Sequence, residues 1–169
     1  MRLVFLMLVL SSSNIYSENL TDIFNASIEK ANLAFTQSSI NPYTNSIDKS
    51  EGRIIRSNKG ILVFVDTPFM EKYELYGDEI IVTDIELDQI SRVSVNDFGD
   101  NTLLDIFTNG ITNSSSDYEL EQTSDSIIIN SLNNETYNKI EIKFKESKIH
   151  YLKYNDNLDI ENLIIFKDL

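Results

Sequence analysis

The stretch EGRIIRSNKGILVFVDTPFMEKYELYGDEIIVTDIELDQIS, residues 51–91, decides the fold of this chain of 169 residues. It consists of short runs rich in Ile, Val, Phe and Tyr, which are separated by polar residues or glycine. Runs of four to seven residues at this spacing are typical of strands joined by tight turns. Residues 58–60 and 76–78 each offer a glycine for a hairpin turn. The stretch therefore predicts an antiparallel meander.

Two helices are predicted around this meander. Residues 19–35 carry apolar side chains close to the spacing of one helical face, with Asn19 or Thr21 as the N-cap. A polar stretch over 36–51 follows it. A second, short helix is predicted between Asp100 or Asn101 and a terminating glycine at position 110.

Further strand-like runs fill the rest of the chain. The predicted strands are 53–56, 61–65, 72–76, 79–84, 89–95, 118–122, 126–132, 139–144, 148–154 and 162–166. Many consecutive short strands, with one helix before them and another between them, predict a mainly β fold. We expect a single strongly curved sheet whose helices cover one opening.

The N-terminus has the three parts of a secretory signal peptide: one positive charge at Arg2, an apolar run over 3–10 and a small polar stretch over 11–17. The apolar run is far shorter than the roughly 20 residues of a membrane span. We therefore expect a signal peptide at 1–17 and a single exported domain at 18–169. Cleavage after Ser13 is the competing prediction.

Composition excludes several classes of protein. The chain has 14 Lys and Arg against 27 Asp and Glu, a net charge of −13, which argues against binding nucleic acid. It has no cysteine, so it is neither a disulfide scaffold nor anchored through a lipidated cysteine. The negative charge either serves solubility or steers docking to a basic partner.

Catalytic patterns are sparse. The single histidine, His150, lies in a predicted strand, and no cysteine or metal-ligand cluster accompanies it. Asp84, Glu86 and Asp88 alternate and would face one way on a strand, as a glycosidase-like pair or a calcium site would require. A solvated turn is the alternative that we favour. We expect no enzyme activity, no cofactor and no metal.

Motif positions within and beside residues 51–91 follow an ordered pattern. A glycine opens a strand, an apolar strand ends in proline, and a later apolar strand leads into Asp-x-x-Leu-x-Gln. The positions are Gly52, Pro68, Gly77, Asp84, Leu87 and Gln89, with AFTQ at 34–37 upstream and NTLL at 101–104 downstream. In order and spacing the chain resembles the LolA family of periplasmic lipoprotein carriers.

The resemblance implies an incomplete, open antiparallel β-barrel with an α-helical lid, enclosing an apolar cavity. It implies a periplasmic chaperone that takes acylated lipoproteins from an inner-membrane ABC transporter to an outer-membrane acceptor, LolB or an equivalent. Such a carrier is expected to be a monomer. A LolA-like protein for another lipid or glycolipid is the main alternative, followed by a carbohydrate-acting enzyme and a structural β-protein without a cavity.

Hiding an acyl chain from water requires apolar side chains rather than charges, since each buried CH₂ contributes roughly 0.8 kcal/mol. The predicted cavity residues are Ile61, Val63, Val65, Tyr73, Leu75, Ile81 and Ile90. The predicted lid residues are Ile23, Phe24, Leu103, Leu104 and Phe107. Ordinary core packing is the alternative for each, because a register shift of one residue would exchange Ile61 and Val63 for Leu62 and Phe64.

Two departures from the family pattern affect these assignments. Leu62 and Val63 stand where the family has a basic and an aromatic residue, so Arg56 is the nearest candidate for a side chain that latches the lid. The sequence also ends at Leu169, where family members continue. We therefore expect either a more open barrel or an abbreviated ending.

Overall fold

The computed structural model describes residues 19–98, 102–132, 139–156 and 158–169. The predicted signal peptide lies outside these residues, and so do positions 100 and 101, where the second helix was predicted to begin. Within them the chain forms helix α1 (Leu20–Glu29), a short 3-10 helix η1 (Val95–Phe98) and helix α2 (Thr102–Asn109). No helix in the described ranges is long and apolar enough to cross a membrane.

The remaining elements form one antiparallel sheet of eleven strands within the described residues. They are β1 (Asn32–Ile40), β2 (Ile47–Arg56), β3 (Ile61–Thr67), β4 (Glu71–Tyr76), β5 (Glu79–Asp84), β6 (Gln89–Ser94), β7 (Tyr118–Gln122), β8 (Ser126–Ser131), β9 (Lys139–Lys145), β10 (Lys148–Asn155) and β11 (Glu161–Asp168). Their spatial order is β6-β5-β4-β3-β2-β1-β11-β10-β9-β8-β7. The first and last strands thus meet at the centre of the sheet.

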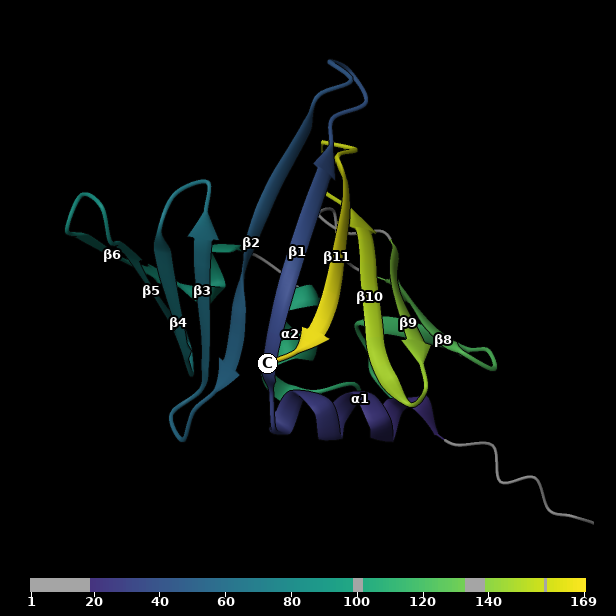
Figure 1. Ribbon diagram of the computed structural model, residues 1–169. Coiled ribbons are helices and arrows are strands. Elements are labelled where there is room, and N and C mark those ends of the chain that lie inside the picture. Colours follow the sequence, from purple (N-terminus) through teal and green to yellow (C-terminus); the bar gives the residue numbers. More distant parts are fainter. Residues whose placement is uncertain (1–18, 99–101, 133–138, 157) are drawn as a thin grey trace, which may run out of the picture.

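The sheet is curved and stays open between its edge strands, β6 and β7. The chain passes from one edge to the other through η1 and α2, and α2 lies behind β1 and β11 in the hollow of the sheet (Figure 1). Helix α1 lies across one end of the central strands. The predicted fold, a mainly β open antiparallel sheet with helices, is confirmed.

The predicted helix over 19–35 is wrong in its second half. Helix α1 begins after Asn19, whose side chain accepts a hydrogen bond from Thr21 N (3.2 Å), and it ends at Glu29. From Asn32 onward the chain is strand β1, which pairs with β2 on one side and with β11 on the other. Pairing on both sides supplies hydrogen-bond partners for the backbone of this stretch, and that outweighs its helical spacing.

The predicted polar stretch over 36–51 contains the second half of β1 and the first half of β2. Its inward positions are polar, Gln37 and Ser39 on β1 opposite Ser50 and Asp48 on β2, so no apolar alternation marks it as strand. The strands from β3 onward and helix α2 were predicted close to their observed bounds. The predicted turn glycines also lie in turns, and Gly77 has φ of 57°.

Candidate functional site

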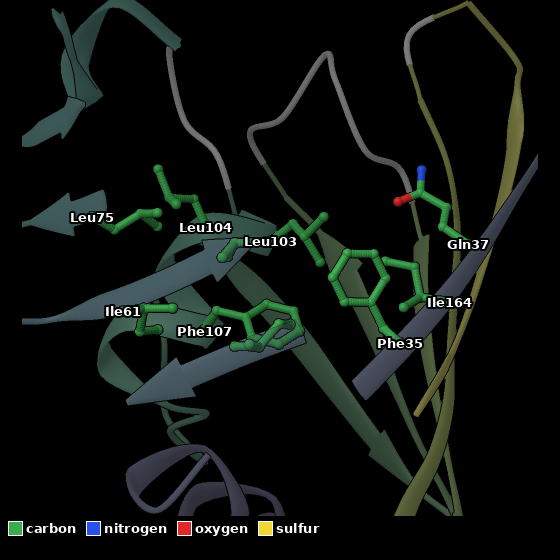
Figure 2. A pocket seen from close by; sticks show the side chains of 10 residues that line it. Phe35, Gln37, Ile61, Leu75, Leu103, Leu104, Phe107 and Ile164 are labelled. Atoms are coloured by element: carbon green, nitrogen blue, oxygen red, sulfur yellow. The ribbon is translucent and has the colours of Figure 1, made fainter. Parts of the chain in front are cut away.

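The hollow face of the sheet and helix α2 enclose an inner cavity of about 240 Å³. Figure 2 shows side chains from both sides converging on it, with Leu103, Leu104 and Phe107 of α2 facing Phe35 and Ile61 of the sheet. The lining residues are Phe35, Gln37, Ile54, Ile61, Val63, Leu75, Leu103, Leu104, Phe107 and Ile164. Gln37 is the one polar side chain among these ten, so the inner cavity is an apolar site.

A larger outer cavity of about 550 Å³ adjoins the inner one. Both are lined by Phe35, Gln37, Val63, Leu75, Leu103 and Leu104, and the outer cavity extends over β3, β4 and β5. Its volume lies within the roughly 300 to 1,000 Å³ of ligand pockets. Pro68 and Phe69 lie at its rim, where the Phe69 side chain is 65% exposed. We call the two adjoining cavities together the trough, and most of the residues that line it are apolar.

Aromatic packing positions α2 over this trough. The Phe107 ring lies 6.1 Å from the Phe24 ring of α1 and 6.5 Å from the Phe166 ring of β11, measured between ring centroids. Ile106, next to it, is fully buried. These contacts hold one side of the helix in the core, which leaves Leu103 and Leu104 as walls of the cavities.

The C-terminal end of α2 is held by hydrogen bonds from two other elements. Gly110 ends the helix with φ of 84°, and the carboxamide of Asn25 on α1 bonds both backbone groups of Ile111, at 2.7 and 2.9 Å. Arg56 of β2 donates from Nη2 to the backbone oxygen of Thr108 at 3.2 Å. A guanidinium beside the last carbonyls of a helix is also favoured by the helix dipole. The structure thus places Arg56, the predicted latch residue, against α2.

Replacing Arg56 by Met is expected to loosen α2 selectively. The change removes a hydrogen bond from a charged donor, worth about 1.5 to 3 kcal/mol, so backbone amides of α2 should exchange with solvent roughly 10 to 100 times faster. The global free energy of unfolding should change little, because Nη1 of Arg56 is buried without a partner among the described residues. Hydrogen exchange read by mass spectrometry measures both. Equal acceleration in α2 and in the β9–β10 core would contradict the prediction.

Two side chains of β4 give the outer cavity a polar edge. Tyr73 donates its hydroxyl hydrogen to Glu71 Oε2 at 2.6 Å. Burial, with the hydrogen bond and the charge of Glu71, raises the pKa of Tyr73 to about 12. The phenol therefore stays neutral at physiological pH. Among the described residues, Glu71 is the one charged residue that lines the outer cavity.

Most of the predicted cavity residues lie together on the hollow face. Ile61, Val63, Val65, Tyr73 and Leu75 all line the inner cavity, the outer cavity or both. Ile81 and Ile90 do not, and this corrects the prediction. Ile81 pairs with Glu74 and Arg92 and Ile90 with Thr83, on the outer face of the sheet. Ile80 and Val82, the neighbours of Ile81 on β5, line the outer cavity instead.

The predicted lid residues divide between two roles. Leu103, Leu104 and Phe107 line the inner cavity, whereas Phe24 and Ile23 of α1 do not. Phe24 is fully buried beneath Phe107, and Ile23 packs against the core. Helix α1 therefore supports α2 rather than facing the trough.

Several lining residues were not predicted from the sequence: Phe35, Gln37, Ser50, Ile54, Pro68, Phe69, Glu71, Ile80, Val82, Tyr154 and Ile164. A signal existed for Phe35 and Gln37, since the AFTQ segment that contains them contributed to the family resemblance. Its assignment to a helix end concealed their place on a central strand.

The acidic and histidine candidates lie away from the trough. Strand β5 ends at Asp84, whose Oδ1 accepts a hydrogen bond from Leu87 N (2.9 Å), so Glu86 and Asp88 lie in an exposed turn. In the described part of the chain, no group of three or more His, Asp or Glu side chains is arranged to hold a metal ion. His150 is exposed on β10, at an irregularity in its pairing with β9.

Comparison with known proteins finds similarity among solved structures. No family model matches the sequence, and no curated protein matches it either. The chain is similar to a LolA superfamily protein from Nitrosomonas europaea, with 12% identity over 87% of this chain and 90% of that one and a TM-score of 0.43. It is also similar to a putative outer membrane lipoprotein-sorting protein domain from Vibrio parahaemolyticus, with 9% identity over 88% and 89% and a TM-score of 0.45.

A third solved structure, the MucA/MucB complex of Pseudomonas aeruginosa, is similar over 88% of this chain and 56% of that one, with 10% identity and a TM-score of 0.45. The residues that line the trough are the basis for inferring which ligand the protein binds.

Proposed function

We propose that this protein is a periplasmic carrier that binds the acyl chains of lipoproteins in its trough and moves them from the inner to the outer membrane. The observation that carries the proposal is the trough itself, two adjoining cavities of about 240 and 550 Å³ whose walls are mainly apolar. The family resemblance of the sequence supports lipoproteins as the cargo.

The energetics of the trough suit reversible binding of a chain. Each CH₂ moved from water to an apolar surface contributes roughly 0.8 kcal/mol, so a long acyl chain needs no specific polar contact to bind. Part of this gain is offset by the cost of ordering the chain. The open edge between β6 and β7 leaves the sheet free to adjust, as a carrier that must release its cargo requires.

The same trough suits binding rather than catalysis. In the part of the chain that the structure describes, its walls hold one carboxylate, Glu71, which is bonded to the Tyr73 phenol, and no histidine. The carrier would act without cofactor or reaction, and its partners would be the inner-membrane ABC transporter that releases lipoproteins and the outer-membrane acceptor LolB or an equivalent. Monomers would leave the mouth of the trough accessible to both.

Native mass spectrometry of the protein purified from a bacterial periplasm tests the proposal. We expect a one-to-one complex with an acylated lipoprotein, and we expect the empty protein to extract lipoprotein from inner-membrane vesicles. A complex with a free lipid or glycolipid would favour the alternative amphiphile carrier. An empty protein that also fails to extract lipoprotein would rule out the lipoprotein carrier.

A further inference from the structure

A hydrogen-bonded chain of polar groups fixes the orientation of Gln37. Asn162 of β11 is 5% exposed, and its Nδ2 donates to the backbone oxygen of Ile160 at 3.1 Å. Asn162 Oδ1 is therefore an acceptor, and it receives bonds from Ser39 Oγ (2.7 Å) and Gln37 Nε2 (3.1 Å). Gln37 Nε2 also donates to Ser39 Oγ at 3.2 Å. Both donor hydrogens of the Gln37 amide are thus used within the sheet.

The carboxamide oxygen of Gln37 is left facing the trough. No group among the described residues donates a hydrogen bond to Gln37 Oε1, and the residue lines both cavities. In Figure 2 this oxygen lies on the side of Leu103, and the nitrogen is turned away. A ligand that fills the trough removes water from this oxygen. It must then supply a donor or leave a polar group unpaired, which is costly.

The charged residues of the hollow face argue against an anionic group of the ligand beside Gln37 Oε1. Strand register places Arg56 on the hollow face and every other Lys and Arg of the described strands on the outer face. Arg56 is bonded to Thr108 of α2 and lines neither cavity. The charged group that a ligand does meet is the Glu71 carboxylate. A phosphate or carboxylate at the head of the ligand would face this charge without a counter-ion.

We propose that the ligand carries, beside its acyl chain, an uncharged group whose N–H or O–H donates a hydrogen bond to Gln37 Oε1, and that amphiphiles with anionic head groups are rejected. The inference rests on the proposed function, because it assigns the polar end of a chain bound in the same trough. Amides of N-acylated peptides and hydroxyls of acylglycerols share this donor chemistry. Esters without a donor lack it.

Matched sixteen-carbon ligands test the inference by displacement of a fluorescent acyl probe from the wild-type protein. N-hexadecanoylglycinamide supplies amide donors, monohexadecanoylglycerol supplies hydroxyls, methyl hexadecanoate supplies none, and hexadecyl phosphate is anionic. We expect at least one of the two donor ligands to bind about five- to tenfold more tightly than the methyl ester, with the phosphate weakest. The tighter of the two donor ligands identifies whether the source is a peptide amide or a glyceride hydroxyl.

Gln37→Leu should reduce the preference for the donor ligands over methyl hexadecanoate from about five- to tenfold to less than about twofold. Ser39→Ala is the matched control, because it alters the same polar cluster and leaves the Gln37 oxygen in place; its preference should persist. Equal affinities in the wild type, a preference that survives Gln37→Leu, or tight binding of hexadecyl phosphate would each overturn the inference. Binding of none of the ligands, the methyl ester included, would instead refute the acyl-chain trough itself.

Discussion

Replacing Val63 by Asp is expected to lower the affinity for a long acyl chain by at least about 30-fold. Val63 lies on the hollow face of β3 and lines both cavities, so a bound chain must pass it. A carboxylate pressed against an acyl chain loses its water and gains no counter-ion, a cost of at least about 2 kcal/mol. Displacement of a fluorescent acyl probe, or calorimetric titration, measures the change. The empty variant should stay folded, because the trough admits water to the new carboxylate.

Ile81→Asp is the control for this prediction. It introduces the same carboxylate on the outer face of the neighbouring hairpin, in register with Arg92 of β6. Binding should then remain within about twofold of the wild type. Loss of binding in both variants, or in neither, would contradict the assignment of the trough as the binding site. The pair also tests the register directly, since the sequence predicted Ile81 as a cavity residue.

The error at Ile81 has a specific cause. Strand β5 reads EIIVTD, in which adjacent branched residues fit either face, so alternation cannot decide which of them points inward. The pairing with β4 decides it, because Ile80 lies opposite Leu75 and Val82 opposite Tyr73. Strand β9, KIEIKFK, alternates cleanly, and its isoleucines are buried on the hollow face as the pattern predicts. Clean alternation therefore predicts from the sequence which side chains of a strand face inward. A run of similar apolar residues does not.

The central strands were harder to predict than the peripheral ones. Short strands joined by sequential hairpins, such as β3 to β6, are defined by their local runs of apolar residues and by the polar or turn residues between them. Strand β1 instead pairs with β11 at the opposite end of the chain, and no local signal encodes that contact. Its inward polar residues Gln37 and Ser39 donate hydrogen bonds to Asn162, a partner more than a hundred residues away. The hydrogen bonds of Gln37 and Ser39 to Asn162 could not be predicted from the sequence for the same reason.

Gly52→Ala is expected to destabilise the fold by about 3 kcal/mol. A Cβ at Gly52 would lie 1.9 Å from the backbone oxygen of Phe64 and 2.9 Å from Cζ of Phe35. Relief requires β2 and β3 to separate at their pairing irregularity and the Phe35 ring to move. Because that ring lines both cavities, acyl binding should weaken as well. Chemical denaturation measures the free energy of unfolding.

Gly77→Ala provides the comparison that separates crowding from backbone strain. Gly77 has φ of 57°, and a Cβ there would meet nothing within 4 Å. Its substitution should cost only about 1 kcal/mol, the strain of an alanine in the left-handed region, and should leave acyl binding unchanged. If the two variants lost equal stability, the close approach of β2, β3 and Phe35 would not be what requires glycine at position 52. A selective loss at Gly52 would show that the packing of the central strands and the shape of the trough depend on the same contact.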